Sequence, residues 1–268
     1  MLGPMDVLLE DERLPSVALP AELHRLYGGD LGFSEPCVYA NFVATLDGIV
    51  AIPSIPSSNS LIGMESKTDH FVMGLLRAFA DVVLIGAGVL RASPTGTWLP
   101  EKVYPAATDA FAELRRDLGK TDAPEVAVLT GSGAIDPSHP VFEAGAVVLT
   151  SAPGAERLAG QLPAAGSIIV LGDDTTIDGR RVVEALLERG HRLILSEAGP
   201  HAFGSLVAAQ AVDELFLTVS PLLVGGGEDR YRLVESTGPL PGVRGRLTNL
   251  RQSGEHVFLR YDLRHGAA

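Results

Sequence analysis

Residues 192–207 read RLILSEAGPHAFGSLV, a short apolar run followed by a turn of small residues and the start of a helix. The apolar run predicts a buried strand, and Pro200 suits the first turn of a helix, where its missing N–H is not needed. The first N–H groups of a helix have no helical partner and lie at the positive end of its dipole, so the turn at 197–200 predicts an anion-binding site. Glu197 would repel phosphate, so we expect it to face another part of the ligand, such as a ring with N–H groups or a ribose.

Short apolar segments and helical segments alternate on both sides of this stretch. Such alternation predicts an α/β fold with a mostly parallel central sheet and helices on both faces. Near the C-terminus, segments 246–252 and 256–263 flank Ser253-Gly254-Glu255 and predict an antiparallel hairpin at the edge of the sheet. The expected strands are 38–46, 82–85, 126–129, 146–149, 168–171, 193–195 and 215–219, and the expected helices are 21–27, 66–79, 109–118, 155–162, 178–189 and 202–209.

Composition restricts the class of protein. A chain of 268 residues with 46% hydrophobic content can bury a full core, and we expect a single domain over 37–268 preceded by a polar, proline-rich arm over 1–36. The net charge of −12 disfavours nucleic acid and anionic membranes as partners. Only Cys37 is available, which excludes an intramolecular disulfide, and no apolar run near the N-terminus is long enough to span a membrane. We therefore expect a cytoplasmic protein.

The common signatures of nucleotide and metal enzymes are incomplete. Gly86-Ala87-Gly88 begins like a dinucleotide fingerprint, but Arg91 stands where the third glycine is needed, and Gly131-Ser132-Gly133 fails in the same way. Neither is clearly followed by a helical run. No histidine has a partner at metal-ligand spacing, so no metal is expected. A short-chain dehydrogenase would need a fuller glycine fingerprint and a tyrosine-lysine pair at helical spacing, and neither is present.

Small-residue turns after the predicted strands are the remaining signal. Open α/β sheets bind ligands just outside the carboxyl ends of their strands, so turns gathered there predict a binding groove. The turns in question are 47–48, 86–88, 130–133, 172–175 and 197–200.

The order and spacing of these motifs resemble the C-terminal reductase domain of the bifunctional riboflavin-pathway deaminase-reductase and its stand-alone relatives. The resemblance spans residues 38 to 263. It implies a dihydrofolate-reductase-like fold, a homodimer, which would also cover the edge of the hairpin, and NADPH-dependent reduction of a phosphoribosylamino-pyrimidine by hydride transfer. No zinc-deaminase signature precedes the domain, so the chain resembles the reductase half alone. The motifs that carry the resemblance are 41–48, 81–88, 197–200, 212–215 and 221–227.

The resemblance also implies roles for single residues. Asn41, Asp47 and Glu197 match the substrate side of the site. Thr130 and Ser132 are expected to take the 2′-phosphate of NADPH, because no arginine pair is evident for it. The positions that match the NADPH groove are Thr45, Gly86, Ala87, Gly88, Val89, Gly172, Ala198, Gly199 and Pro200.

Several positions depart from the pattern of these reductases, although the cofactor side keeps the pattern better than the substrate side. Ile49 follows Asp47-Gly48 where a lysine is usual, Val89 replaces a threonine, and Ala198 replaces a glycine. Residues 91–95, Arg-Ala-Ser-Pro-Thr, stand where relatives carry Asp-Asp-Pro near the substrate phosphate. Three functions therefore stay open: reduction of 5-amino-6-(5-phosphoribosylamino)uracil, reduction of dihydrofolate or another pterin on the same scaffold, and NADPH binding without catalysis.

Two acids carry the expected chemistry. Hydride addition to a C=N bond also requires a proton, and we expect Asp47 to orient the ring and supply that proton, directly or through a water, with burial raising its pKa. We expect Glu197 to accept hydrogen bonds from ring N–H groups or from the nicotinamide amide. We interpret Arg77 as a solvated or salt-bridged helix residue.

Overall fold

The computed structural model of the protein describes residues 2–55, 58–236, 240 and 242–264. Within them a ten-stranded sheet has the order β1-β11-β12-β9-β2-β8-β4-β5-β6-β7, and β10 pairs with β3 in a small second sheet. The seven strands from β9 to β7 are parallel, whereas β12, β11 and β1 are added antiparallel. The predicted mostly parallel α/β fold with a C-terminal hairpin is therefore confirmed. The strands are β1 Asp6–Glu10, β2 Cys37–Ala44, β3 Ile49–Ala51, β4 Val82–Gly86, β5 Glu125–Thr130, β6 Val147–Thr150, β7 Ser167–Val170, β8 Leu193–Ser196, β9 Glu214–Val219, β10 Tyr231–Arg232, β11 Arg246–Ser253 and β12 His256–Asp262.

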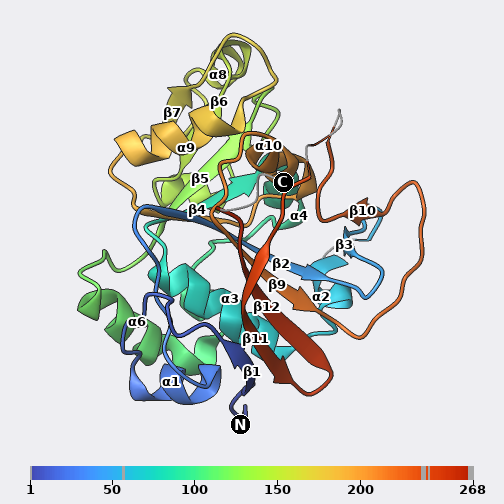
Figure 1. Cartoon of the computed structure of the whole chain (residues 1–268). Coiled ribbons are helices and arrows are strands. Elements are labelled where there is room, and N and C mark those ends of the chain that lie inside the picture. Colours follow the sequence, from blue (N-terminus) through green and yellow to red (C-terminus); the bar gives the residue numbers. More distant parts are fainter. Residues whose placement is uncertain (1, 56–57, 237–239, 241, 265–268) are drawn as a thin grey trace.

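Helices cover both faces of the large sheet, and alternate residues of each strand meet them (Figure 1). Tyr39 of β2 packs in the core with α1, α3 and α6, whereas its neighbour Ala40 packs in the opposite core with α9 and α10. This two-residue alternation is the period of a strand that is buried on both faces. The helices are α1 Ala21–Tyr27, α2 Ser58–Ile62, α3 Lys67–Phe79, α4 Ala87–Ala92, α5 Pro100–Val103, α6 Thr108–Asp117, α7 Pro140–Glu143, α8 Ala152–Leu158, α9 Gly179–Glu188 and α10 Pro200–Ala208, with a 3₁₀ turn at Pro105–Ala107.

Helix α3 shows how local sequence sets an element. Ser66 caps its N-terminus, where the Ser66 hydroxyl accepts a hydrogen bond from the backbone N–H of Asp69 (3.3 Å). Phe71, Leu75 and Phe79 then recur at the spacing of one helical face and are fully buried. This cap and this apolar face explain why the helix expected over 66–79 forms.

The N-terminal segment is part of the sheet. Strand β1 pairs with β11, so the first strand of the chain lies beside the last hairpin, dark blue beside red in Figure 1. Leu23 and Leu26 of α1 are buried in the main core. Residues before β2 therefore contribute to the sheet and to the core, whereas the sequence predicted an arm over 1–36. The outer edge of the hairpin is covered by β1, so this edge gives no support to a homodimer, which stays a prediction from the resemblance.

A buried ion pair joins the parallel strands to the hairpin. Glu214 of β9 is 1% exposed and accepts a hydrogen bond from Nε of Arg260 in β12 (2.7 Å). Arg260 also donates to the carbonyl oxygen of Gly32 (2.8 Å), and its guanidinium lies 5.1 Å from the ring of Phe33. The buried charges are therefore paired, and Arg260 links β12 both to β9 and to the segment before β2.

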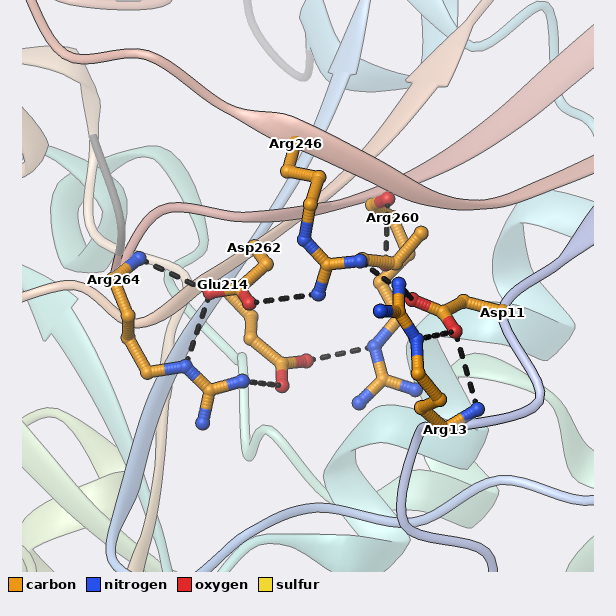
Figure 2. Close-up of polar contacts among 8 residues, drawn as sticks. Asp11, Arg13, Glu214, Arg246, Arg260, Asp262 and Arg264 are labelled. Atoms are coloured by element: carbon orange, nitrogen blue, oxygen red, sulfur yellow. Dashed lines mark hydrogen bonds and ion pairs between the residues drawn. The ribbon is translucent and has the colours of Figure 1, made fainter. Parts of the chain in front are cut away.

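Figure 2 shows that this pair belongs to a larger network. Arg264 donates to Glu214 (3.3 Å) and to Asp262 (3.0 Å). Arg246 of β11 bridges Asp262 (3.1 Å) and Asp11, which follows β1. Charged side chains thus connect both ends of the chain across β9, β11 and β12.

In the residues that the structure describes, no helix is both long and apolar enough to cross a bilayer.

We expect Arg260→Met to lower the free energy of unfolding by about 3–5 kcal/mol, because it leaves the Glu214 carboxylate buried without its main partner. Arg13→Ala is the matched control, since Arg13 pairs with Asp11 in the same network but is exposed to solvent. Chemical denaturation followed by circular dichroism measures both. An Arg260→Met protein as stable as the wild type would contradict this account of the network.

Candidate active site

The turns predicted to bind a ligand lie along one edge of the sheet. Strands β2, β8, β4, β5, β6 and β7 are paired in parallel, so their carboxyl ends lie on the same side. The prediction that these turns share an edge is confirmed. Neighbouring strands are ~4.8 Å apart, so the edge from β9 to β7 is roughly 29 Å long. Strand β8 lies between β2 and β4 and places residues 197–200 near its middle.

The turns after β8 and β4 form a cradle of bare backbone. Gly199 precedes α10 and Gly86 precedes α4, and neither helix start is capped by a side chain. A Cβ added to Gly199 would meet only Val89, at 3.7 Å, and one added to Gly86 would come no closer than 3.8 Å to any other atom. The free N–H groups of α10 and the absence of side chains on these glycines suit a phosphate-bearing ligand. Our expectation that no helix clearly follows Gly86-Ala87-Gly88 is wrong, because α4 does.

The other cofactor positions predicted around this cradle differ in exposure. Gly88 is exposed, whereas Ala87 and Val89 are half-buried in α4. Ala198 and Pro200 are buried. These two residues therefore offer a ligand mainly their backbone or a small patch of surface.

The turn after β5 is shaped largely by packing. A Cβ on Gly131 would lie 1.8 Å from the carbonyl oxygen of Thr175, and one on Gly133 would lie 2.4 Å from that of Gly154. These glycines therefore allow backbones to approach one another. Thr130 is buried, whereas Ser132 is exposed. Gly172, after β7, has no other atom within 4 Å of an added Cβ and is open to a ligand.

Glu197 is paired with Arg77 of α3. Its two carboxylate oxygens accept hydrogen bonds from Nε (2.8 Å) and Nη2 (2.6 Å) of Arg77, and both side chains are 10% exposed. The expectation that Glu197 accepts hydrogen bonds from a ligand stays a prediction, whereas the interpretation of Arg77 as salt-bridged is confirmed. Because Arg77 offsets the charge of Glu197, phosphate can bind at the start of α10 close to this carboxylate.

Asp47 is exposed in the turn after β2. One of its oxygens accepts a hydrogen bond from the Thr45 hydroxyl (2.5 Å), and the other accepts one from the backbone N–H of Gly225 (2.7 Å). The Thr45 hydroxyl and these N–H groups lower the pKa of Asp47. The expected burial with a raised pKa is therefore wrong, because the bonds that stabilise the carboxylate outweigh its slight desolvation. Asp47 ties the glycine-rich loop 221–227 to the end of β2.

The substrate-side residues lie on the α3 side of the sheet. Asn41 is buried in β2 two residues after Tyr39, so it faces the same side as Tyr39. Thr45 is buried, and its hydroxyl also accepts the backbone N–H of Ile49 (3.0 Å). In Figure 1, α2, β3 and β10 lie together beside the ends of β2 and β9. The edge thus has a part with backbone that carries no side chain at β8 and β4 and a part at β2 where Asn41 and Thr45 are buried.

Arg77 is the site residue to which sequence reasoning assigned no functional role. Its one local signal is a charge within the apolar run Leu75-Leu76-Arg77-Ala78-Phe79. The partner of Arg77 lies 120 residues away on a different element, which no local pattern encodes.

Comparison with known proteins identifies the family. Residues 36–259 match the family described as the RibD C-terminal domain. The chain belongs to the RibD C-terminal domain family. It is 24% identical over 197 residues to the 2,5-diamino-6-ribosylamino-4(3H)-pyrimidinone 5′-phosphate reductase of Archaeoglobus fulgidus, a match that covers 72% of this chain and 83% of that protein.

Solved structures support the same fold for this RibD C-terminal domain protein. A pyrimidine reductase-like protein from Corynebacterium diphtheriae superposes with a TM-score of 0.68 at 22% identity, covering 92% of this chain and 95% of that one. RibD of Acinetobacter baumannii superposes with a TM-score of 0.64 at 17% identity, covering 85% of this chain and 58% of that one. The α/β fold expected of the family is therefore confirmed.

One departure from the family pattern has a structural counterpart. Ile49, which replaces the usual lysine, is buried in β3 and packs with Val43, Ile52 and Ile62. This RibD C-terminal domain therefore has an apolar cluster where an amine is usual.

We expect Gly199→Ala to weaken NADPH binding about tenfold, because the added methyl fills the cradle while the backbone angle of Gly199, φ −64°, suits alanine. Gly131→Ala is the contrasting variant. Its methyl meets the backbone at Thr175, so we expect a loss of about 3 kcal/mol in stability. Fluorescence titration with NADPH and thermal melting separate the two effects. Unchanged NADPH affinity in Gly199→Ala would contradict the cradle.

We expect Arg77→Met to cost about 3–5 kcal/mol of stability and to raise the Kd for NADPH about tenfold, because Glu197 becomes an uncompensated charge. The double variant Arg77→Met/Glu197→Gln removes that charge and is expected to regain most of both losses. Melting and NADPH titration of the two variants test this. A double variant that regains neither would show that Arg77 acts by some other means than neutralising Glu197.

Proposed function

We propose that this protein is an NADPH-dependent reductase of riboflavin biosynthesis that reduces the C=N bond of an open-chain ribosylamino-pyrimidine phosphate. The observation that carries the proposal is the cradle of bare backbone at Gly199 and Gly86, next to the ion-paired Glu197 on the α3 side of the sheet. The printed name of the Archaeoglobus fulgidus relative, a ribosylaminopyrimidinone phosphate reductase, supports the substrate class.

The groove residues fit NADPH. Gly172 leaves open space above the backbone, Gly86, Gly88 and Gly199 present backbone without a side chain, and the first turn of α10 presents N–H groups to a pyrophosphate. When bound, NADPH supplies the hydride. The protein residues position the cofactor and substrate so that the reacting atoms approach one another, which is a large part of catalysis in hydride transfer.

Arg91 supports NADPH over NADH. Its guanidinium bridges α4 and the turn after β5, where Nη1 donates to the carbonyl oxygen of Ala134 (3.2 Å) and Nη2 lies 4.0 Å from an added Cβ on Gly88. Ser132 is exposed on the same turn. A positive charge beside these hydroxyl and backbone groups is the environment that a 2′-phosphate requires. In a chain with net charge −12, such a local cation is needed to offset the overall field.

Asn41, Asp47 and Glu197 are proposed to hold the substrate. The Asp47 carboxylate accepts hydrogen bonds from substrate N–H or hydroxyl groups and orients the ring. Glu197, held in place by Arg77, does the same at the boundary between substrate and cofactor. A pterin is the second candidate substrate, because the buried Ile49 removes the amine that ribosylamino-pyrimidine reductases usually place after Asp47-Gly48.

The decisive experiment follows NADPH absorbance at 340 nm, the wavelength of the reduced nicotinamide, with three substrates in parallel: the phosphoribosylamino-uracil, its 2,5-diamino-pyrimidinone analogue and dihydrofolate. We expect turnover with one or both ribosylamino-pyrimidines, and faster turnover with NADPH than with NADH. Turnover of dihydrofolate alone would establish the second candidate. NADPH binding without oxidation by any substrate would instead indicate a non-catalytic module.

A further inference from the structure

Asp69 is a buried acid that the proposed function does not yet use. Asp69 lies in the first turn of α3 and is 5% exposed. The Thr218 hydroxyl donates a hydrogen bond to its carboxyl group. Burial raises the pKa of Asp69, and the charge of Glu197 adds to this shift, although Thr218, His70 and His256 partly oppose it. An aspartate in such surroundings retains its proton to higher pH than an exposed one.

Asp69 lies at the edge of the sheet that carries the site. Thr218 of β9 pairs in register with Val43 of β2, and each is one residue before the end of its strand. A Cβ added to Gly63 would lie 3.6 Å from Oδ2 of Asp69 and 3.7 Å from Cγ2 of Val43, so both side chains lie beside Gly63. Asn41 is two residues before Val43 on the same face of β2. Asp69 therefore lies beside the ends of β2 and β9, and β2 is the strand that carries Asn41.

The surroundings of Asp69 are apolar on the side of β3. Val43, which like Asp69 lies beside Gly63, packs with Ile49, Ile52 and Ile62. His256 lies on the other side and donates from Nε2 to the carbonyl oxygen of Gly63 (3.1 Å). The apolar cluster includes Ile49, at the position where the resemblance implies a lysine. Apolar side chains therefore stand there in place of a basic group.

The three acids on this part of the edge differ in what they can donate. Asp47 is exposed and its pKa is lowered. Glu197 forms an ion pair with Arg77. Among the residues described, no basic side chain forms an ion pair with Asp69. The hydrogen-bond partner of its carboxyl group is the Thr218 hydroxyl.

We propose that Asp69 supplies the proton for the reduction, a step that rests on the proposed function. As the hydride adds to the carbon of the C=N bond, the Asp69 O–H bond breaks and an N–H bond forms at the nitrogen, directly or through one water. The Asp69 carboxylate that results is stabilised by the Thr218 hydroxyl and takes its next proton from solvent. Asp47 and Glu197 are left to orient the substrate.

The pH dependence follows from this assignment. The active form is protonated, so the hydride-transfer rate is constant below the pKa of Asp69 and falls tenfold per pH unit above it. Thr218 lowers that pKa by hydrogen bonding to the carboxylate, so Thr218→Val moves the fall to higher pH. His70 and His256 act in the same direction as Thr218, and Glu197 in the opposite one.

The test compares wild type, Asp69→Asn, Thr218→Val and Asp109→Asn in single-turnover NADPH oxidation with the ribosylamino-pyrimidine phosphates across pH. Asp109 is the matched control, an exposed acid in the first turn of α6. We expect Asp69→Asn to slow the step 10²–10⁴-fold and to lose the fall at high pH, with an unchanged Kd for NADPH and an unchanged melting temperature. Asp109→Asn should match the wild type. Carbon NMR of labelled aspartate should show a carboxyl group that titrates at elevated pH in the wild type and is missing in Asp69→Asn.

The outcomes separate this inference from the proposed function. Wild-type turnover with an Asp69→Asn rate within threefold of it overturns the assignment of Asp69 alone. A Thr218→Val profile that does not move also overturns it, independently of whether Asp69→Asn folds. A wild-type protein that oxidises NADPH with none of these pyrimidines overturns the proposed function and this inference with it.

Discussion

The insertion of β8 between β2 and β4 is the constraint on which the site depends. Strand β8 comes late in the chain, yet it pairs in parallel with β2 on one side and β4 on the other. Asp81 holds the beginning of β8 in place. One of its carboxylate oxygens accepts hydrogen bonds from the backbone N–H groups of Arg192 (2.7 Å) and Leu193 (2.8 Å), and the other accepts one from Nζ of Lys120 (2.5 Å). Burial opposes ionisation of Asp81, but these donors outweigh it and lower its pKa. Without this insertion, residues 197–200 would not lie between the turns after β2 and β4.

The ion pair of Arg77 and Glu197 connects the two parts of the edge. Arg77 comes from α3, and Glu197 begins the turn at which we propose that the cofactor phosphate binds. A carboxylate at the start of a helix that must accept phosphate would be unfavourable by itself, and a buried guanidinium would be equally costly. The opposite charges of Arg77 and Glu197 offset the cost of burying each of them. The pair therefore lets an acidic protein place an acid close to an anionic ligand.

Environment gives the acids of the edge different properties. Asp47 is exposed and bonded by backbone N–H groups, Glu197 is bonded by a guanidinium, and Asp69 is buried beside a hydroxyl and an apolar cluster. The same functional group can thus orient, pair or donate according to what surrounds it. The family resemblance favoured Asp47 as the proton source because it matches the substrate side of the site. Burial, which the sequence did not reveal, favours Asp69.

The sequence by itself determined the features that depend on neighbouring residues. These include the strand and helix alternation, the Ser66 cap and apolar face of α3, the hairpin around Ser253-Gly254-Glu255, and the placing of the small-residue turns on one edge, since parallel strands end on the same side. Only the tertiary structure decided which distant groups meet: β1 with β11, Arg77 with Glu197, the turn at Gly131 with Thr175, and Asp69 with Thr218. Periodicity and turn chemistry act within a few residues and can be read locally. Burial and long-range pairing depend on how all the elements pack at once, so they emerge only when the chain is folded.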